Sequence, residues 1–171
     1  MNLAKPEIGL VINYSYLWHR EAEQGQVEGR KDRPCAVILT AKGDRVVVLP
    51  ITHTTPPPGS KAIEIPIQVK RPLGLDTERS WIITSEFNVF KWPGFDLRPI
   101  NRRIPDKIAY GMLPPGILKT AKQALSKNAH DKSLKQVERD DDAYLKSVSA
   151  QLERFKERPA TTSTKKDDRL K

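Results

Sequence analysis

The sequence predicts a mainly β protein with helices toward its C-terminal end. Before residue 113, apolar residues come in short runs separated by Pro, Gly and charged clusters, which is typical of a small antiparallel barrel or sandwich. After residue 115, the apolar residues recur with the period of a helix. The pattern changes at Leu113-Pro114-Pro115-Gly116, and we expect the strands to lie before this segment.

Three strands are predicted before residue 52. Residues 9–14 (GLVINY) form the first apolar run, and residues 35–40 and 45–51 form the next two. The AKGD sequence between the second and third runs has the length and composition of a hairpin turn. We therefore expect these two strands to pair antiparallel.

Two further strands are predicted before the helical region. Residues 62–67 (AIEIPI) alternate between apolar and other residues, which indicates a half-buried strand, and Pro66 favours a sheet edge or a strand end. Residues 80–90 (SWIITSEFNVF) are rich in β-branched and aromatic residues, and we expect them to form one strand.

Two amphipathic helices are predicted after residue 115. The first carries one apolar stripe on a Lys-rich helix, formed by Ile117, Leu118, Ala121 and Leu125. The second begins near residues 140–142, where Asp carboxylates can cap free N–H groups, and it ends before Pro159. Its apolar stripe consists of Tyr144, Leu145, Val148, Leu152 and Phe155. Residues 160–171 are polar and charged without an apolar period, and we expect them to be disordered.

The composition indicates which partners, cofactors and cellular location to expect. The chain has 171 residues, with 30 Lys+Arg against 21 Asp+Glu and a net charge of +9, which suits a polyanionic partner. Its one Cys excludes an internal disulfide, and its three His lack the spacing of a metal site, so we expect no metal or other cofactor. No run approaches the roughly 18 apolar residues of a membrane span, and a signal-peptide pattern is absent, so we expect a cytoplasmic protein without membrane contact.

Arg33 is the first residue that we expect to take part in chemistry. Pro34 restricts it to extended conformations, directly before a buried strand. A planar, permanently charged guanidinium at such a rim suits the binding of a phosphate or carboxylate. A structural ion pair with Glu28 or Asp32 is the alternative.

Hydroxyl groups cluster where the next predicted strand ends. Thr52, Thr54 and Thr55 lie there, and hydroxyls at a strand end can donate hydrogen bonds to phosphate oxygens. The same residues also form ordinary turns, which is the alternative interpretation. His53 lies among them and is a reserve candidate for a general base.

Short motifs occur in a fixed order along the chain. They are G-x-V at Gly9 and Val11, E-x4-RP at Glu28, Arg33 and Pro34, and P-x-T at Pro50 and Thr52. Residues 85–88 (SEFN) then supply an acidic residue, and a Pro-Pro-Gly segment with an apolar helix closes the region. In this order and spacing, residues 7–126 resemble the MazF/PemK family, which are ribonuclease toxins of bacterial toxin–antitoxin pairs.

The resemblance implies an SH3-like antiparallel β-barrel of the MazF/PemK/CcdB type. It also implies a homodimer that cuts single-stranded RNA without a metal and is neutralised by a cognate antitoxin. On this basis the barrel domain with its closing helix occupies residues 1–126. We expect a helical extension over residues 127–159 and a disordered basic tail over residues 160–171.

The resemblance also implies a catalytic pair, which falls on Arg33 and Thr52. RNA supplies its own nucleophile, the 2′-OH, so cleavage needs a proton acceptor, a proton donor and positive charge, and it yields a 2′,3′-cyclic phosphate and a 5′-OH. Glu86 is the candidate base, and pairing with a nearby Lys or Arg is its alternative role. The other residues that we expect to contact RNA are Trp18, Glu28, Arg30, Lys31, His53 and Asn88.

Two other functions fit the sequence. A catalytically silent barrel could bind nucleic acid or protein, because Val27 and Thr84 stand where the PemK branch has His and Arg. Alternatively, the apolar stripe over residues 144–155 is the working surface of an interaction protein.

Overall fold

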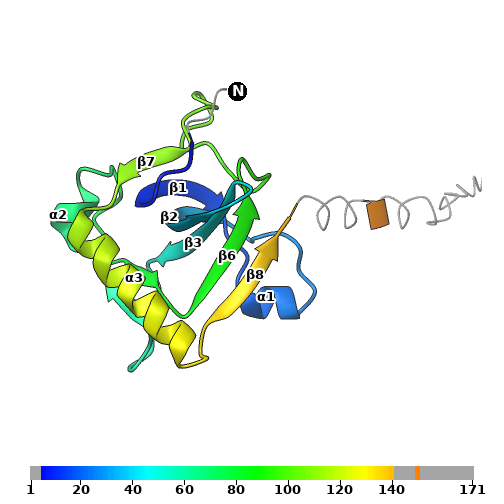
Figure 1. The fold of residues 1–171 in the computed structure, drawn as a ribbon. Helices are drawn as coiled ribbons and strands as arrows, with labels where there is room; N and C mark the ends of the chain where they lie inside the picture. The colour runs from blue at the N-terminus through cyan, green and yellow to red at the C-terminus, as the bar shows by residue number, and fades with distance from the viewer. Residues whose placement is uncertain (1–4, 141–148, 151–171) are drawn as a thin grey trace, which may run out of the picture.

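The computed structural model describes residues 5–140 and 149–150, and its main feature is a mostly antiparallel sheet with a few helices (Figure 1). The strands are β1 (Leu10–Ser15), β2 (Asp32–Ala41), β3 (Arg45–Thr52), β4 (Ala62–Glu64), β5 (Trp81–Ile83), β6 (Glu86–Lys91), β7 (Ala109–Met112) and β8 (Lys135–Arg139). The helices are α1 (His19–Glu23), α2 (Ile67–Lys70) and α3 (Pro115–His130). The mainly β fold class and the helix after residue 115 are therefore confirmed.

The sheet has β3 near its centre. Its strands pair in the order β4-β5-β3-β2-β1-β7, and β6 pairs with both β3 and β8. The predicted antiparallel hairpin is confirmed by β2 and β3. Among the described strands, only β6 and β8 pair in parallel. Within the same residues β4, β7 and β8 each pair on one side, so the sheet is not closed.

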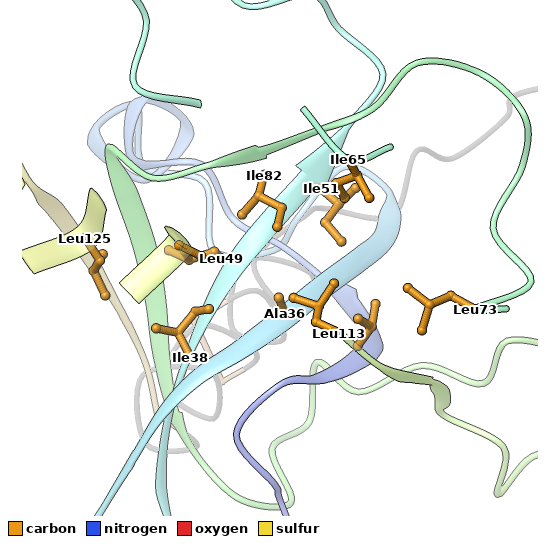
Figure 2. Close-up of a cluster of buried hydrophobic side chains, with 11 residues drawn as sticks. Ala36, Ile38, Leu49, Ile51, Ile65, Leu73, Ile82, Leu113 and Leu125 are labelled. Carbon is orange, nitrogen blue, oxygen red and sulfur yellow. The ribbon is translucent and has the colours of Figure 1, made fainter. Parts of the chain in front are cut away.

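One face of the sheet packs against α3. Figure 2 shows its buried side chains gathered around β2 and β3, with Leu125 reaching them from the helix. In α3, Ala121 is also buried, and Ile117 and Leu118 pack against the cluster, so the predicted apolar stripe is confirmed. The buried members are Val11, Ala36, Ile38, Leu49, Ile51, Ile65, Leu73, Ile82, Leu113, Ala121 and Leu125.

The opposite face of β2 and β3 carries a second buried cluster. It consists of Ile12, Tyr14, Tyr16, Cys35, Val37, Val46, Val48 and Phe90. Burial raises the pKa of the Cys35 thiol, so this side chain is a packing group rather than a nucleophile. Because side chains alternate along a strand, Arg33 belongs to the same side of β2 as Cys35. Thr52 belongs to the same side of β3 as Val48.

Two predicted strands are wrong in their extent. Residues 62–67 form a strand only over Ala62–Glu64, because Pro66 lacks the N–H that a ladder needs and instead precedes the first turn of α2. Residues 80–90 form two strands, β5 and β6, which pair with different parts of β3. Between them, the N–H and the hydroxyl of Thr84 both donate to the carbonyl of Lys61 at 2.9 Å.

Sequence patterns missed α1, α2, β7 and β8. Within residues 127–159, which the sequence predicts to be helical, β8 is a strand on the edge of β6, and that expectation is wrong for Lys135–Arg139. The second predicted helix with its stripe over 144–155, and the tail 160–171, lie outside the described residues apart from the helical residues 149 and 150. In the part of the chain that is described, no helix is both long and apolar enough to cross a membrane.

Replacing Leu49 with Ala should destabilise the protein far more than replacing Leu39. Leu49 in β3 is fully buried, whereas the Leu39 side chain in β2 is 44% exposed. Truncating a buried Leu lowers the free energy of unfolding by about 2–5 kcal/mol. We expect a loss below about 1 kcal/mol for Leu39→Ala, measured by urea unfolding. Equal losses for the two variants would contradict this description of the core.

Candidate nucleic-acid groove

The three predicted catalytic residues come from strand ends that meet. Arg33 lies near the start of β2, Thr52 is the last residue of β3, and Glu86 is the first residue of β6. In the β2–β3 pair, Cys35 faces Pro50, so the start of β2 lies beside the end of β3. The antiparallel β3–β6 pair likewise turns the start of β6 toward the end of β3. The sheet register therefore carries all three side chains to one end of the sheet.

These three side chains line one groove with a volume of about 650 Å³. Trp18 and Lys31, which the sequence predicts to contact RNA, line the same groove. Other cationic, acidic and apolar groups complete it: Arg20, Lys61, Glu21, Pro56, Pro57 and Ile83. Neither Arg20 nor Lys61 stands in a motif, so their sequence context does not point to them.

Arg33 has no acidic partner in the described residues. Its guanidinium carbon lies 4.9 Å from the centroid of the Trp18 ring, and its buried Nε has no hydrogen-bond partner. Neither predicted alternative ion pair forms: Glu28 is exposed, and Asp32 lies 3.7 Å from Arg98 instead. Burial lowers the pKa of the Arg33 guanidinium from its ordinary value, against an opposing electrostatic effect of Cys35, Glu21 and Tyr16. The side chain is thus a cation held on an aromatic ring, with donors left for an anion.

Thr52 offers a hydroxyl proton at the same place. The side chain is buried, with only 9% of the residue exposed. Its Oγ1 accepts a hydrogen bond from the N–H of Thr54 at 3.2 Å. A hydroxyl that accepts one bond still has its own proton to donate. This proton can reach an oxygen of a ligand in the groove.

Glu86 combines a structural contact with an available oxygen. Its Oε1 accepts from the N–H of His19 at 2.9 Å and from the hydroxyl of Tyr16 at 3.4 Å, at the start of α1. No hydrogen bond to Oε2 is found in the described residues. The carboxylate therefore anchors α1 with one oxygen and can accept a proton with the other.

A smaller pocket of about 140 Å³ adjoins the groove and shares Arg33, Lys31 and Thr52 with it. His53 lines this pocket. The Nε2 of its ring lies 2.7 Å from an Asp76 carboxylate oxygen, and its Nδ1 lies 3.1 Å from the carbonyl oxygen of Arg79. Ser80 Oγ lies 3.2 Å from the same Nδ1, so both ring nitrogens already have partners within the protein, which weakens His53 as the reserve base.

Lys70 is a buried residue of this pocket that the sequence did not point to, because its burial depends on a loop that folds back over α2. Its ammonium group is almost fully buried and donates to Asp76 Oδ1 at 2.7 Å and to Ser80 Oγ at 2.6 Å. Burial would raise the pKa of Asp76, but the hydrogen bond from Lys70 and the nearby His53 outweigh it, so this pKa lies below its usual range. The chain Lys70–Asp76–His53 fixes one wall of the smaller pocket.

One group in the described residues has the ligand types for a divalent metal. The ligand atoms of His53, Asp76 and Glu78 all lie within 4.8 Å of one another, and all three residues are exposed. The ammonium of Lys70, which is 2.7 Å from Asp76, opposes a further cation there. The positions of His53, Asp76 and Glu78 in the sequence did not predict this group, because it is the loop after α2 that brings the two carboxylates to His53.

Four residues that the sequence predicts to contact RNA do not line the groove, and one of them, His53, lines the adjoining pocket instead. Asn88 is completely buried: its amide oxygen accepts from the N–H of Leu17 at 3.1 Å, and its amide nitrogen donates to the Leu17 carbonyl at 2.8 Å. That prediction is wrong, because both ends of the amide are used to hold the backbone before Trp18. Glu28 is exposed outside the groove, and Arg30 lies 3.2 Å from Glu21.

The sequence matches no protein-family model, and no curated protein is significantly similar to it.

Replacing Asn88 with Ala should destabilise the protein through the backbone of Leu17. The change leaves a buried N–H and a buried carbonyl without partners, at about 1–3 kcal/mol each. The exposed Gln123 on α3 is a matched control, and we expect Gln123→Ala to change the free energy of unfolding by less than about 0.5 kcal/mol. Thermal and urea unfolding measure both. An Asn88→Ala protein as stable as the control would contradict this role.

Proposed function

We propose that this protein is a metal-independent endoribonuclease that cleaves single-stranded RNA and is neutralised by a cognate antitoxin. On this proposal the sheet is an SH3-like barrel of the MazF/PemK type that acts as a homodimer. The supporting observation is that the Arg33 guanidinium, unpaired in the described residues, and the Thr52 hydroxyl line one groove. The alternating antiparallel order of β1, β2, β3 and β6 and the helix α3 are consistent with that fold.

The chemistry needs no nucleophile from the protein. The 2′-oxygen of the ribose forms a bond to phosphorus as the bond from phosphorus to the 5′-oxygen breaks. Glu86 Oε2 takes the proton of the 2′-OH, and Arg33 protonates the departing 5′-oxygen, helped by the burial that lowers its pKa. Arg33 and the Thr52 hydroxyl stabilise the charge on the non-bridging oxygens of the transition state. The products are a 2′,3′-cyclic phosphate and a 5′-OH, and water restores both side chains.

The rest of the groove suits a single strand. Lys31, Arg20 and Lys61 place positive charge around it, which favours the phosphate backbone. Trp18 and the two prolines, Pro56 and Pro57, offer apolar surface for unpaired bases. Stacking on an aromatic ring contributes about 1–3 kcal/mol per base.

A catalytically silent binding module is the second candidate. It is favoured by the structural contacts of Glu86, whose Oε1 already holds the start of α1. On that reading the carboxylate is present for stability, and the groove binds RNA without cutting it.

Arg33→Ala should abolish cleavage of a single-stranded RNA in the presence of EDTA. Loss of the charge at the phosphorane should lower the rate by at least about 10²–10³-fold, and Thr52→Val should lower it by about 10²-fold. Arg103, exposed in the loop after β6, provides the control variant Arg103→Ala, which should keep the wild-type rate. Mass spectrometry of the fragments should show cyclic phosphates. Cleavage that requires a metal, or 5′-phosphate products, would contradict the mechanism.

Glu86→Gln separates the base from the structural anchor. Glutamine retains an acceptor oxygen for the N–H of His19, so the melting temperature should stay within a few degrees of the wild type. It cannot take a proton at neutral pH, so cleavage should fall by about 10²-fold or more while binding to a 2′-deoxy oligonucleotide persists. Unchanged cleavage would remove Glu86 from the mechanism. Binding without cleavage by the wild-type protein itself would favour the silent module.

A further inference from the structure

The loop between α1 and β2, residues 24–31, forms part of the groove without being a regular element. Its last residue, Lys31, lines both the groove and the adjoining pocket. Arg33 follows two residues later. The position of this loop therefore determines where the ammonium group of Lys31 lies relative to Arg33 and Thr52.

Contacts with α1 and with the end of β1 hold several residues of the loop. Gly29 approaches β1 so closely that a Cβ there would lie 2.5 Å from the carbonyl oxygen of Tyr16. The Nε of Arg30 lies 3.2 Å from a Glu21 carboxylate oxygen. The N–H of Gln26 also donates to the carbonyl oxygen of Glu21 at 3.0 Å, so α1 holds the loop up to the residue before Val27.

A further contact, to Val27, comes from β8. The Nη1 of Arg139, the last residue of β8, donates to the carbonyl oxygen of Val27 at 2.6 Å. Its Nε and Nη2 donate to the two oxygens of Asp96 at 2.7 and 3.0 Å. Arg139 and Asp96 are 6% and 2% exposed, and the guanidinium lies 5.2 Å from the centroid of the Phe95 ring. Because one rigid, planar guanidinium binds both the Val27 carbonyl and the Asp96 carboxylate, it fixes the loop relative to that buried carboxylate.

Asp96 is itself fixed to the sheet. Its carbonyl oxygen accepts from the N–H of Ser15 in β1 at 2.9 Å, and one of its carboxylate oxygens accepts from the Tyr14 hydroxyl at 3.3 Å. The Arg139 fork therefore joins β1, the loop and β8. In contrast, β8 is an edge strand whose pairing in the described residues is with β6 alone.

We propose that Arg139 is a positioning residue for the groove. It holds the loop 24–31 through the carbonyl of Val27, so that Lys31 stays beside Arg33. Because Arg139 belongs to β8, RNA binding then depends on the correct packing of β8 against the sheet. Arg139 does not line the groove, so its effect passes through the loop. The RNA part of this inference rests on the proposed function, whereas the coupling of β8 to the loop does not.

Arg139→Lys tests the coupling in the full-length protein. A lysine keeps the charge beside Asp96 but has one nitrogen instead of a fork, so it cannot maintain both contacts. We expect trypsin to cut after Arg30 and Lys31 about tenfold faster than in the wild type under native conditions. We also expect roughly tenfold weaker binding to a fluorescent 2′-deoxy single-stranded oligonucleotide.

Arg45→Lys is the matched control. Arg45 in β3 pairs with Glu138, so it also fastens β8 to the sheet, but it makes no contact with the loop. A lysine at this position keeps the positive charge beside Glu138 and so the seating of β8, and this variant should keep the wild-type rate of loop proteolysis and the wild-type affinity. Gly29→Ala pushes the loop off β1 without changing Arg139, and it should reproduce both the faster proteolysis and the weaker binding of Arg139→Lys. It replaces Arg139→Lys as the test if the Arg139→Lys protein fails to fold.

The outcomes separate the two proposals. Equal rates of loop proteolysis in Arg139→Lys and Arg45→Lys would overturn the coupling between β8 and the loop. Faster proteolysis of Arg139→Lys with an unchanged affinity for the oligonucleotide would overturn the role of Arg139 in binding. A wild-type protein that binds no oligonucleotide, with loop proteolysis still accelerated in Arg139→Lys, would reject the proposed function and keep the coupling.

Discussion

The guanidinium of Arg33 lies against the Trp18 ring where β2, β3 and β6 meet, and its buried Nε has no hydrogen-bond partner. Burying part of a charge without a partner is unfavourable, as the lowered pKa of Arg33 reflects. On the proposed function, a phosphate bound at this guanidinium offsets that cost. By linkage, such a ligand also stabilises the folded chain.

The fold and the groove depend on the same contacts. Asn88 holds the backbone of Leu17, and Glu86 holds the N–H of His19, so that Trp18 between them is fixed by two residues of β6. The aromatic surface under Arg33 is thus fastened to the sheet by β6, although Trp18 itself lies at the start of α1. A buried polar network of this kind costs little when all of its groups are bonded, and it allows one arrangement of the backbone.

Local patterns were enough to predict what depends on neighbouring residues. The apolar runs of β1, β2 and β3, the hairpin turn and the stripe of α3 follow from period and turn composition, and the meeting of Arg33 with Thr52 follows from the hairpin. Patterns failed where a distant contact decides. The break between β5 and β6 falls at Thr84, whose carbonyl oxygen accepts from the side-chain amide of Asn128 in α3. The strand β8 forms on the free edge of β6, and Asn88 is buried where its amide binds the backbone of Leu17. The cluster of Lys70, Asp76 and His53 likewise depends on a loop that no period describes.

On the proposed function, one phosphodiester lies between the Arg33 guanidinium and the Thr52 hydroxyl. A crystal structure of the protein with a 2′-deoxy single-stranded oligonucleotide tests it most directly. We expect a phosphate whose oxygens lie within hydrogen-bond distance of an Arg33 nitrogen and of Thr52 Oγ1, with an adjacent base against Trp18. An oligonucleotide bound on another surface, with Arg33 making no phosphate contact, would contradict it.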